Sequence, residues 1–374
     1  MESPQVGEQV RPFYLGHRPQ LDGLRGVAII LVLLHHAGIP YIHGGHIGVD
    51  IFFVLSGFLI TVLLYREYAE FERIDLKRFY IRRLLRLMPA LAGLLVAFSI
   101  YALAAKSGAA LVKSGQAILV TAVYLSDFAI AFGYAQMGGL SHTWSLAIEE
   151  HFYLIYPIAL LFLLRKRRPL IHVLAMISVL AFVIAVYRIV LWGPDAQEVD
   201  RVFYSFDTRA DGILVGCLLG LITASGRLPA VNWFLALSAA LVLALAAVFV
   251  AWNSALYAYG LPAITVSSAL VLAYALNTRV RWLTNPALVW IGTVSYGLYL
   301  WHNMIFIIFR ERVTDSPWGV LILGSIVSVV CAALSFYLIE KPFLRLKEQL
   351  ASSLPKITSI QAEQMRSPAP SLMP

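Results

Sequence analysis

Charged side chains are scarce in this sequence of 374 residues: they make up only 13% of it, whereas a soluble globular chain usually has about 25%. Hydrophobic residues make up 60% of the chain, and the mean hydropathy is +0.77. A water-soluble fold of this length cannot bury so many apolar side chains, so a soluble enzyme and a disordered chain are excluded. The composition therefore indicates a protein that crosses a membrane several times.

Cysteine is also scarce, with two residues, Cys217 and Cys331, each inside an apolar stretch. Two such residues exclude a disulfide scaffold and lack the spacing of a zinc site, so we expect small core residues and no metal. The sequence also lacks the alternation of apolar and polar residues that marks an outer-membrane barrel. Its apolar stretches have helical length instead, so the expected fold class is all-α.

Eleven apolar stretches between residues 24 and 339 are long enough, or nearly so, to cross a bilayer as helices. The 29 lysine and arginine residues outnumber the 21 acidic ones, and in a membrane protein positive loops face the cytoplasm. Clusters of lysine and arginine lie between several of these stretches. All of them face the cytoplasm only if one stretch within 87–143 does not cross the membrane. The stretch 115–134 contains Gln116 and Asp127, so we expect it to be re-entrant or buried in protein.

The predicted architecture is a polytopic transmembrane bundle of about ten helices in the cytoplasmic (inner) membrane, with both termini in the cytoplasm. We expect residues 1–20 to form a cytoplasmic N-terminal segment, 21–345 the transmembrane domain and 346–374 a disordered cytoplasmic tail. The net charge of +8 is an orientation signal, and the expected partners of the basic side chains are membrane lipids and phosphates rather than nucleic acid.

Ionisable side chains inside a span are costly, so each is a candidate for function. Arg25 and His36 lie in the first stretch, on one helix face and roughly 16 Å apart along the axis. Asp22 is one turn before Arg25 and can pair with it. Alternatively, Arg25 is a snorkelling anchor and His36 an interhelical bond. Asp50, at the start of the second stretch, could orient a histidine or act as a first-turn acid.

A basic amphipathic segment follows the second stretch and carries four arginines at helical spacing. Arg78, Arg82 and Arg86 repeat every four residues, and Arg83 is one turn before Arg86. One interpretation is a helix that lies on anionic lipid headgroups. The other is a clamp for the phosphates of a nucleotide-bearing cofactor, because arginine forks match phosphate oxygens.

The segment 141–153 carries polar groups at the start of another apolar stretch. Glu149 and Glu150 are adjacent acids, which are hard to explain as core residues, and Trp144 and Ser145 precede them. These four residues are therefore candidates for the reaction site.

The segment 295–302 adds Tyr296, Tyr299 and His302 as further candidates. An aromatic belt at the membrane interface explains the tyrosines equally well. A lone histidine in such a setting is more often structural than catalytic.

Six motifs in these stretches resemble those of the acyltransferase-3 family of integral-membrane O-acyltransferases, in the same order along the chain. They are LDGLRGVAIILVLLHH (21–36), GVDIFFVLSGFLIT (48–61), RRLLRLMPA (82–90), HTWSLAIEEHFYLIYP (142–157), SYGLYLWH (295–302) and IEKPF (339–343). Any one of them would be weak alone, but together they are specific, and they cover residues 21 to about 345.

The resemblance implies a transferase that moves an acyl group, commonly acetyl, from cytoplasmic acyl-CoA to a hydroxyl of a saccharide, a lipid-linked sugar or another cell-surface acceptor. The family's Arg-x10-His motif falls on Arg25 and His36, and its Arg-x-x-Arg motif, thought to engage the CoA phosphates, on Arg83 and Arg86. Many relatives carry an appended esterase-like domain. We expect this chain to act through its transmembrane domain alone or to pass the acyl group to a partner.

We therefore expect acyl-CoA, held by Arg78, Arg82, Arg83 and Arg86, to extend its pantetheine arm past Arg25. His36 then deprotonates the acceptor hydroxyl or briefly carries the acyl group, and Asp50 or Glu150 orients its ring. The residues expected to contact the substrates are Trp144, Ser145, Tyr296, Tyr299 and His302.

A transporter or flippase is the alternative, because buried histidine, glutamate and arginine side chains also serve as proton relays. Transporters more often show paired halves with broken helices in matching positions. No such pairing is apparent in this sequence.

Overall fold

The computed structural model describes residues 16–166, 168–193, 195–251 and 253–345. All regular structure in that part of the chain is helical, so the predicted all-α class is confirmed. The expected tail 346–374 and most of the expected N-terminal segment 1–20 lie outside the described residues.

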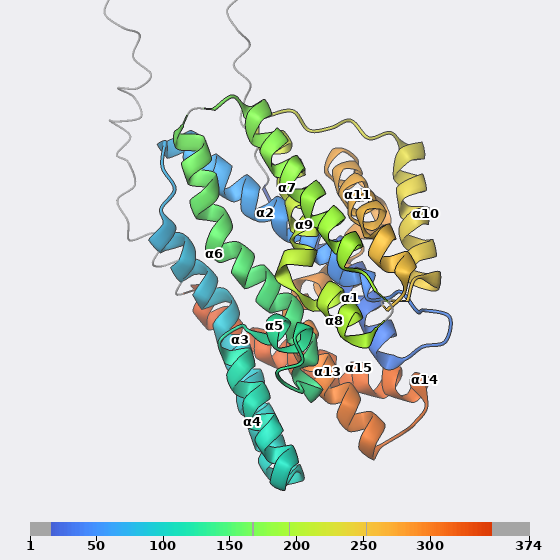
Figure 1. Cartoon of the computed structure of the whole chain (residues 1–374). Coiled ribbons are helices and arrows are strands. Elements are labelled where there is room, and N and C mark those ends of the chain that lie inside the picture. The colour runs from blue at the N-terminus through green and yellow to red at the C-terminus, as the bar shows by residue number, and fades with distance from the viewer. Residues whose placement is uncertain (1–15, 167, 194, 252, 346–374) are drawn as a thin grey trace, which may run out of the picture.

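The helices are joined mainly by short connections and pack into one bundle (Figure 1). Short segments of 3₁₀ or π geometry are labelled η. In chain order the elements are α1 (Pro19–Ala37), α2 (Ile47–Phe71), α3 (Leu76–Ala105), α4 (Gly108–Ala122), α5 (Ser126–Ala131), η1 (Gly138–Thr143), α6 (Trp144–Arg165), α7 (Leu170–Leu191), α8 (Ala196–Tyr204), α9 (Phe206–Ala224), α10 (Trp233–Phe249), α11 (Ala255–Asn277), η2 (Arg281–Thr284), α12 (Pro286–Thr293), α13 (Ser295–Arg312), α14 (Pro317–Gly319), η3 (Val320–Gly324), α15 (Ser325–Leu334) and η4 (Ser335–Glu340).

The number of helices fit to cross a membrane is lower than the ten spans expected. Six helices in the described residues are long and apolar enough, and α12 with α13, bent by 73° at their junction, would make a seventh. The apolar helices α4 and α10 are shorter. Ionisable side chains lower the hydropathy of α1 and α9, which are 19 residues each. Every apolar stretch of the sequence nevertheless contains a helix.

The stretch 115–134, expected to be re-entrant or buried, is interrupted in the structure. Helix α4 ends at Ala122, Tyr124 has a left-handed φ of 55°, and the short helix α5 follows. Asp127 on α5 is fully buried, and its Oδ2 lies 3.3 Å from Nδ1 of His151. Asp127, the acidic residue that argued against a membrane span in this stretch, is thus enclosed by protein.

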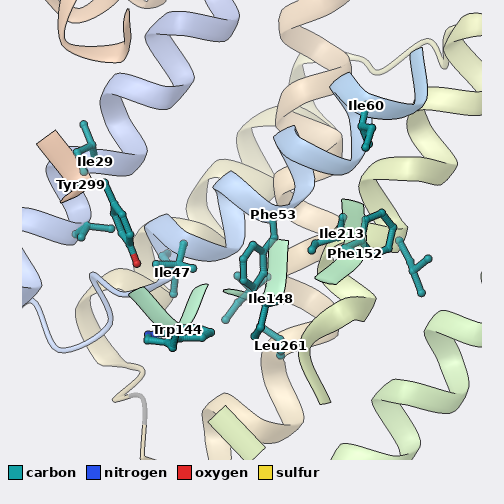
Figure 2. Packing of buried hydrophobic residues seen from close by; sticks show 14 of the residues in the cluster. Ile29, Ile47, Phe53, Ile60, Trp144, Ile148, Phe152, Ile213, Leu261 and Tyr299 are labelled. Atoms are coloured by element: carbon teal, nitrogen blue, oxygen red, sulfur yellow. The ribbon is translucent and has the colours of Figure 1, made fainter. Parts of the chain in front are cut away.

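Helices α2 and α9 cross so closely that only glycine fits at the contact. A Cβ on Gly57 would lie 1.9 Å from the carbonyl oxygen of Ile213, and one on Gly216 would lie 2.1 Å from that of Val54. Small residues allow such backbone contact in membrane helices. Large apolar side chains of α2, α6 and α9 fill the space around this crossing, including Phe53 and Ile148 (Figure 2).

Candidate active site

A cavity of about 880 Å³ lies among α2, α3, α6 and α13. It is lined by the five arginines singled out in the sequence, namely Arg25, Arg78, Arg82, Arg83 and Arg86. Apolar side chains of α2, such as Phe52 and Leu59, form much of the remaining wall. The cavity thus combines arginines with apolar walls, which suits a molecule with a phosphate-bearing head and an uncharged arm.

Asp75 sets the start of α3, because its Oδ1 accepts a hydrogen bond from the backbone N–H of Arg78 at 2.9 Å. The helix therefore begins just before the arginines. Its periodicity puts Arg78, Arg82 and Arg86 on one face, and all three line the large cavity. Local sequence alone is enough to arrange this basic face.

Tyr153 connects the arginines to the acids of α6, a role that the sequence interpretation missed. The guanidinium of Arg83 lies over its ring, 3.6 Å from the centroid. Its hydroxyl donates to Glu149 Oε2 at 3.0 Å and is also hydrogen-bonded to Ser56. Tyr153 follows Glu149 by four residues, so helical spacing was the available signal.

Glu149 and Glu150 both line the large cavity, together with Tyr296, whose hydroxyl donates to the backbone oxygen of Leu87 at 2.9 Å. The two glutamate side chains therefore face the same space as the arginines. The expected pairing of Arg25 with Asp22 is present, with an N–O distance of 3.8 Å.

A second, smaller chamber of about 70 Å³ lies beyond a wall formed by Val49 and Tyr299, which line both spaces. The hydroxyl of Tyr299 is 2.6 Å from Ser145 Oγ and donates to the backbone oxygen of His142 at 2.8 Å. This buried hydroxyl pair holds the tyrosine in place between the two spaces. The wall is therefore only about one side chain thick.

The small chamber is rich in imidazole and aromatic rings. It is lined by His35, His36, His46, Val49, Ser141, His142, Trp144, Phe203, Tyr204 and Tyr299. Phe203 and Tyr204 come from α8, in the connection between α7 and α9. Burial raises the pKa of the Tyr204 phenol, so this side chain keeps its O–H at neutral pH.

His36 lies in this chamber and not in the large cavity. Its Nδ1 donates to the backbone oxygen of Val32 at 3.0 Å, which leaves Nε2 as the unprotonated nitrogen of the neutral ring. Arg310 donates to the backbone oxygen of His36 at 2.8 Å and so anchors the end of α1. The ring of His302 packs against it, with centroids 4.8 Å apart.

The expected orientation of His36 by Asp50 or Glu150 does not hold. Asp50 is fully buried and accepts hydrogen bonds from Arg209 at 2.6 Å and from the hydroxyl of Tyr257 at 3.0 Å. Glu150 lines the large cavity, on the other side of the wall from the chamber of His36. A buried arginine attracts the carboxylate more strongly than a neutral imidazole does.

A second buried ion pair, Arg188 with Asp211 at 2.8 Å, accompanies that of Asp50. Neither arginine was singled out in the sequence, although both are charged residues within apolar stretches. Within the described ranges, no group of three or more His, Cys, Asp or Glu residues is arranged to hold a metal ion.

Comparison with known proteins gives one family and several relatives. The putative peptidoglycan O-acetyltransferase YrhL of Bacillus subtilis is 33% identical over 353 residues, which are 87% of this chain and 54% of that protein. The O-acetyltransferase OatA of Staphylococcus aureus is 30% identical over 367 residues, with coverage of 92% and 60%. The peptidoglycan O-acetyltransferase OatA of Listeria monocytogenes is 33% identical over 346 residues, with coverage of 87% and 55%.

The chain thus spans little more than half the length of these relatives. No solved structure matches it. The acyltransferase domain family matches residues 18–337, which include both the arginine-lined cavity and the histidine chamber. Since the match covers most of the chain, this protein belongs to the acyltransferase-3 family.

Proposed function

We propose that this chain transfers an acetyl group from cytoplasmic acetyl-CoA to a hydroxyl of a cell-wall saccharide, with peptidoglycan as the first candidate. The observation that carries the proposal is the pair of spaces that meet at Val49 and Tyr299. Arginines line one of them, and His36 lies in the other. The peptidoglycan acceptor is suggested by the names of the relatives.

The large cavity has the chemistry of a donor site. Its volume of about 880 Å³ is near the upper end of the roughly 300–1,000 Å³ that small-molecule sites occupy. Arg78, Arg82, Arg83 and Arg86 are proposed to bind the phosphates of CoA, since guanidinium groups bind phosphate oxygens through paired hydrogen bonds. The apolar walls then accommodate the pantetheine arm, which extends past Arg25. In this arrangement the arginine end faces the cytoplasm.

The small chamber is proposed to hold the reacting groups. The thioester carbonyl reaches it when the Tyr299 side chain moves away from Ser145. Nε2 of His36 then takes the proton of the acceptor hydroxyl as its oxygen attacks the carbonyl carbon. The C–S bond breaks, and the proton finally returns to the sulfur of CoA. Phe203 and Tyr204 of α8 are proposed to bind the acceptor, since aromatic rings pack against sugar faces.

Release of free CoA tests this function. The purified protein in lipid nanodiscs, mixed with acetyl-CoA and a soluble muropeptide, is expected to liberate CoA thiol and to yield muropeptide heavier by one acetyl group. Thiol titration and mass spectrometry measure the two products. A transporter or flippase, the alternative suggested by buried ionisable groups, would liberate no thiol, and that result would reject the proposal.

Arg86→Ala is expected to raise the KM for acetyl-CoA by about tenfold or more and to change kcat little. A hydrogen bond to a charged group contributes about 1.5–3 kcal/mol, and phosphates far from the reacting carbonyl bind equally in the ground and transition states. Lys77→Ala, an exposed cation on the same helix outside the cavity, is the matched control. An unchanged KM for Arg86→Ala would show that Arg86 does not bind acetyl-CoA.

A further inference from the structure

Three imidazole rings from distant parts of the chain, those of His36, His142 and His302, lie together with His302 in the middle. His302 on α13 lies 4.8 Å from His36 between ring centroids, and His142 on η1 lies 5.2 Å from His302. Both partners are buried, with 0% and 2% of their surfaces exposed. Rings joined by an N–H···N hydrogen bond have centroids roughly 5 Å apart, so His36 and His302 are at the distance at which two imidazoles can share a proton.

The tautomer of His302 follows from its partners. Its Nδ1 lies 2.7 Å from the backbone oxygen of Tyr299, and a carbonyl oxygen can only accept, so Nδ1 carries the hydrogen. Its Nε2 is therefore a bare acceptor. Among the residues that the structure describes, none hydrogen-bonds to this buried nitrogen. Leaving a buried polar atom without a hydrogen bond costs about 1–3 kcal/mol. A donor that reaches Nε2 of His302 during the reaction would recover this free energy.

In the part of the chain that the structure describes, no carboxylate is paired with His36. The histidine–carboxylate pairs in the described ranges are His17 with Asp22 and His151 with Asp127, both elsewhere. The titratable and charged groups around His36 are other imidazoles, two tyrosine hydroxyls and one cation, contributed by α1, the start of α2, η1, α8 and α13. They are His35, His46, His142, Tyr204, Tyr299, His302 and Arg310.

We propose that His302 is a positioning residue that shares the proton taken up by His36, a role that rests on the acetyl transfer proposed above. The O–H bond of the acceptor breaks, the C–O bond forms and the C–S bond of the thioester breaks. The proton moves to Nε2 of His36, which donates it to Nε2 of His302, and it returns by the same nitrogens to the CoA thiolate. Two rings spread a charge that one buried ring would hold alone.

Two variants separate this role from simple packing. His302→Asn keeps an N–H at the position of Nδ1 for the Tyr299 carbonyl and removes Nε2. His302→Gln places an amide near the position of Nε2, which can accept a hydrogen bond but cannot take the proton. We expect kcat to fall by about 10–100-fold in both, within the range of general acid–base effects. His172→Gln, an exposed histidine on α7, is the matched control and should leave kcat unchanged.

The decisive measurement needs no turnover. Diethyl pyrocarbonate modifies only unprotonated imidazole, so the pH dependence of the modification of His36, followed by peptide mass spectrometry, reports the protonation of that ring. Loss of a neighbour that stabilises the protonated ring favours the neutral ring. In His302→Asn the midpoint should therefore move to lower pH by about half a unit or more, while in His172→Gln it should stay.

An unchanged midpoint in folded His302→Asn would overturn the proposal, and so would a kcat within twofold of that of the wild type. His302→Gln answers the same question if the asparagine variant does not fold. Because the modification is read without substrate, a shifted midpoint in a protein that releases no CoA would sustain the coupling of the two rings while rejecting the proposed transfer.

Discussion

Replacing His36 by alanine is expected to abolish acetyl transfer, with a loss of about 10²–10⁴-fold in kcat. In the proposed reaction its Nε2 is the base that the acceptor hydroxyl meets in the small chamber, since Nδ1 is occupied by the backbone oxygen of Val32. The donor site lies across the wall, so binding of acetyl-CoA to the arginine-lined cavity should persist. The KM for acetyl-CoA is therefore expected to stay within a few-fold of that of the wild type.

The measurement is CoA release at saturating acetyl-CoA by nanodisc-embedded protein, with the amount of folded protein matched by size-exclusion chromatography. His172→Ala removes an exposed imidazole of α7 and is expected to keep full activity. If His36→Ala turned over at the rate of the wild type, the imidazole would have no part in the reaction and the small chamber would not be its site.

The same assay distinguishes a base from an acyl carrier. When radiolabelled acetyl-CoA is supplied without acceptor, a carrier would leave label on a peptide that contains His36, and a base would leave none. We expect none.

The helical class and the arginine face followed from the sequence because both depend on local order. A four-residue repeat puts Arg78, Arg82 and Arg86 on one side of any α-helix, and the acid at Asp75 caps its start. The family motifs, likewise, are contiguous strings. They can therefore be identified without knowledge of how the helices pack.

The partner of Asp50 could not be predicted in the same way. Arg209 is 159 residues away, and it reaches Asp50 across two helices, α2 and α9, that touch at Gly57 and Gly216. The aromatic residues of the chamber and the proximity of His302 to His36 also arise from packing between distant helices. Sequence spacing identified the ionisable residues, but it contained no information on which of them would neutralise one another.

The predicted number of membrane spans was too high for a related reason. The charged residues of α9 lower its hydropathy although Arg209 and Asp211 are buried in the bundle, where their partners satisfy them. The stretch 288–310 reads as one continuous apolar run, yet the chain bends by 73° between α12 and α13. Counting apolar residues does not reveal such bends, since a bend leaves the summed hydropathy of the stretch unchanged.

Replacing Arg209 by glutamine is expected to destabilise the protein by about 3–5 kcal/mol, the usual result of leaving one charge of a buried pair without its partner. Asp50 would keep only the hydroxyl of Tyr257. Asp50→Asn should be milder, because the guanidinium of Arg209 still lies 5.0 Å from the ring of Phe203 and 5.2 Å from that of Trp144, which stabilise a cation. The fraction of monodisperse protein that survives heating measures both.

The double variant, Asp50→Asn with Arg209→Gln, distinguishes a structural role of the Asp50 carboxylate from a role in orienting His36. It leaves no unpaired charge at the α2–α9 crossing, so most of the lost stability should return, and turnover should return with it because Phe203 and Trp144 regain their places in the chamber. If Asp50 instead oriented His36, the double variant would be stable but inactive. Recovery of both properties together would show that Asp50 acts through the fold of the chamber and not on the imidazole.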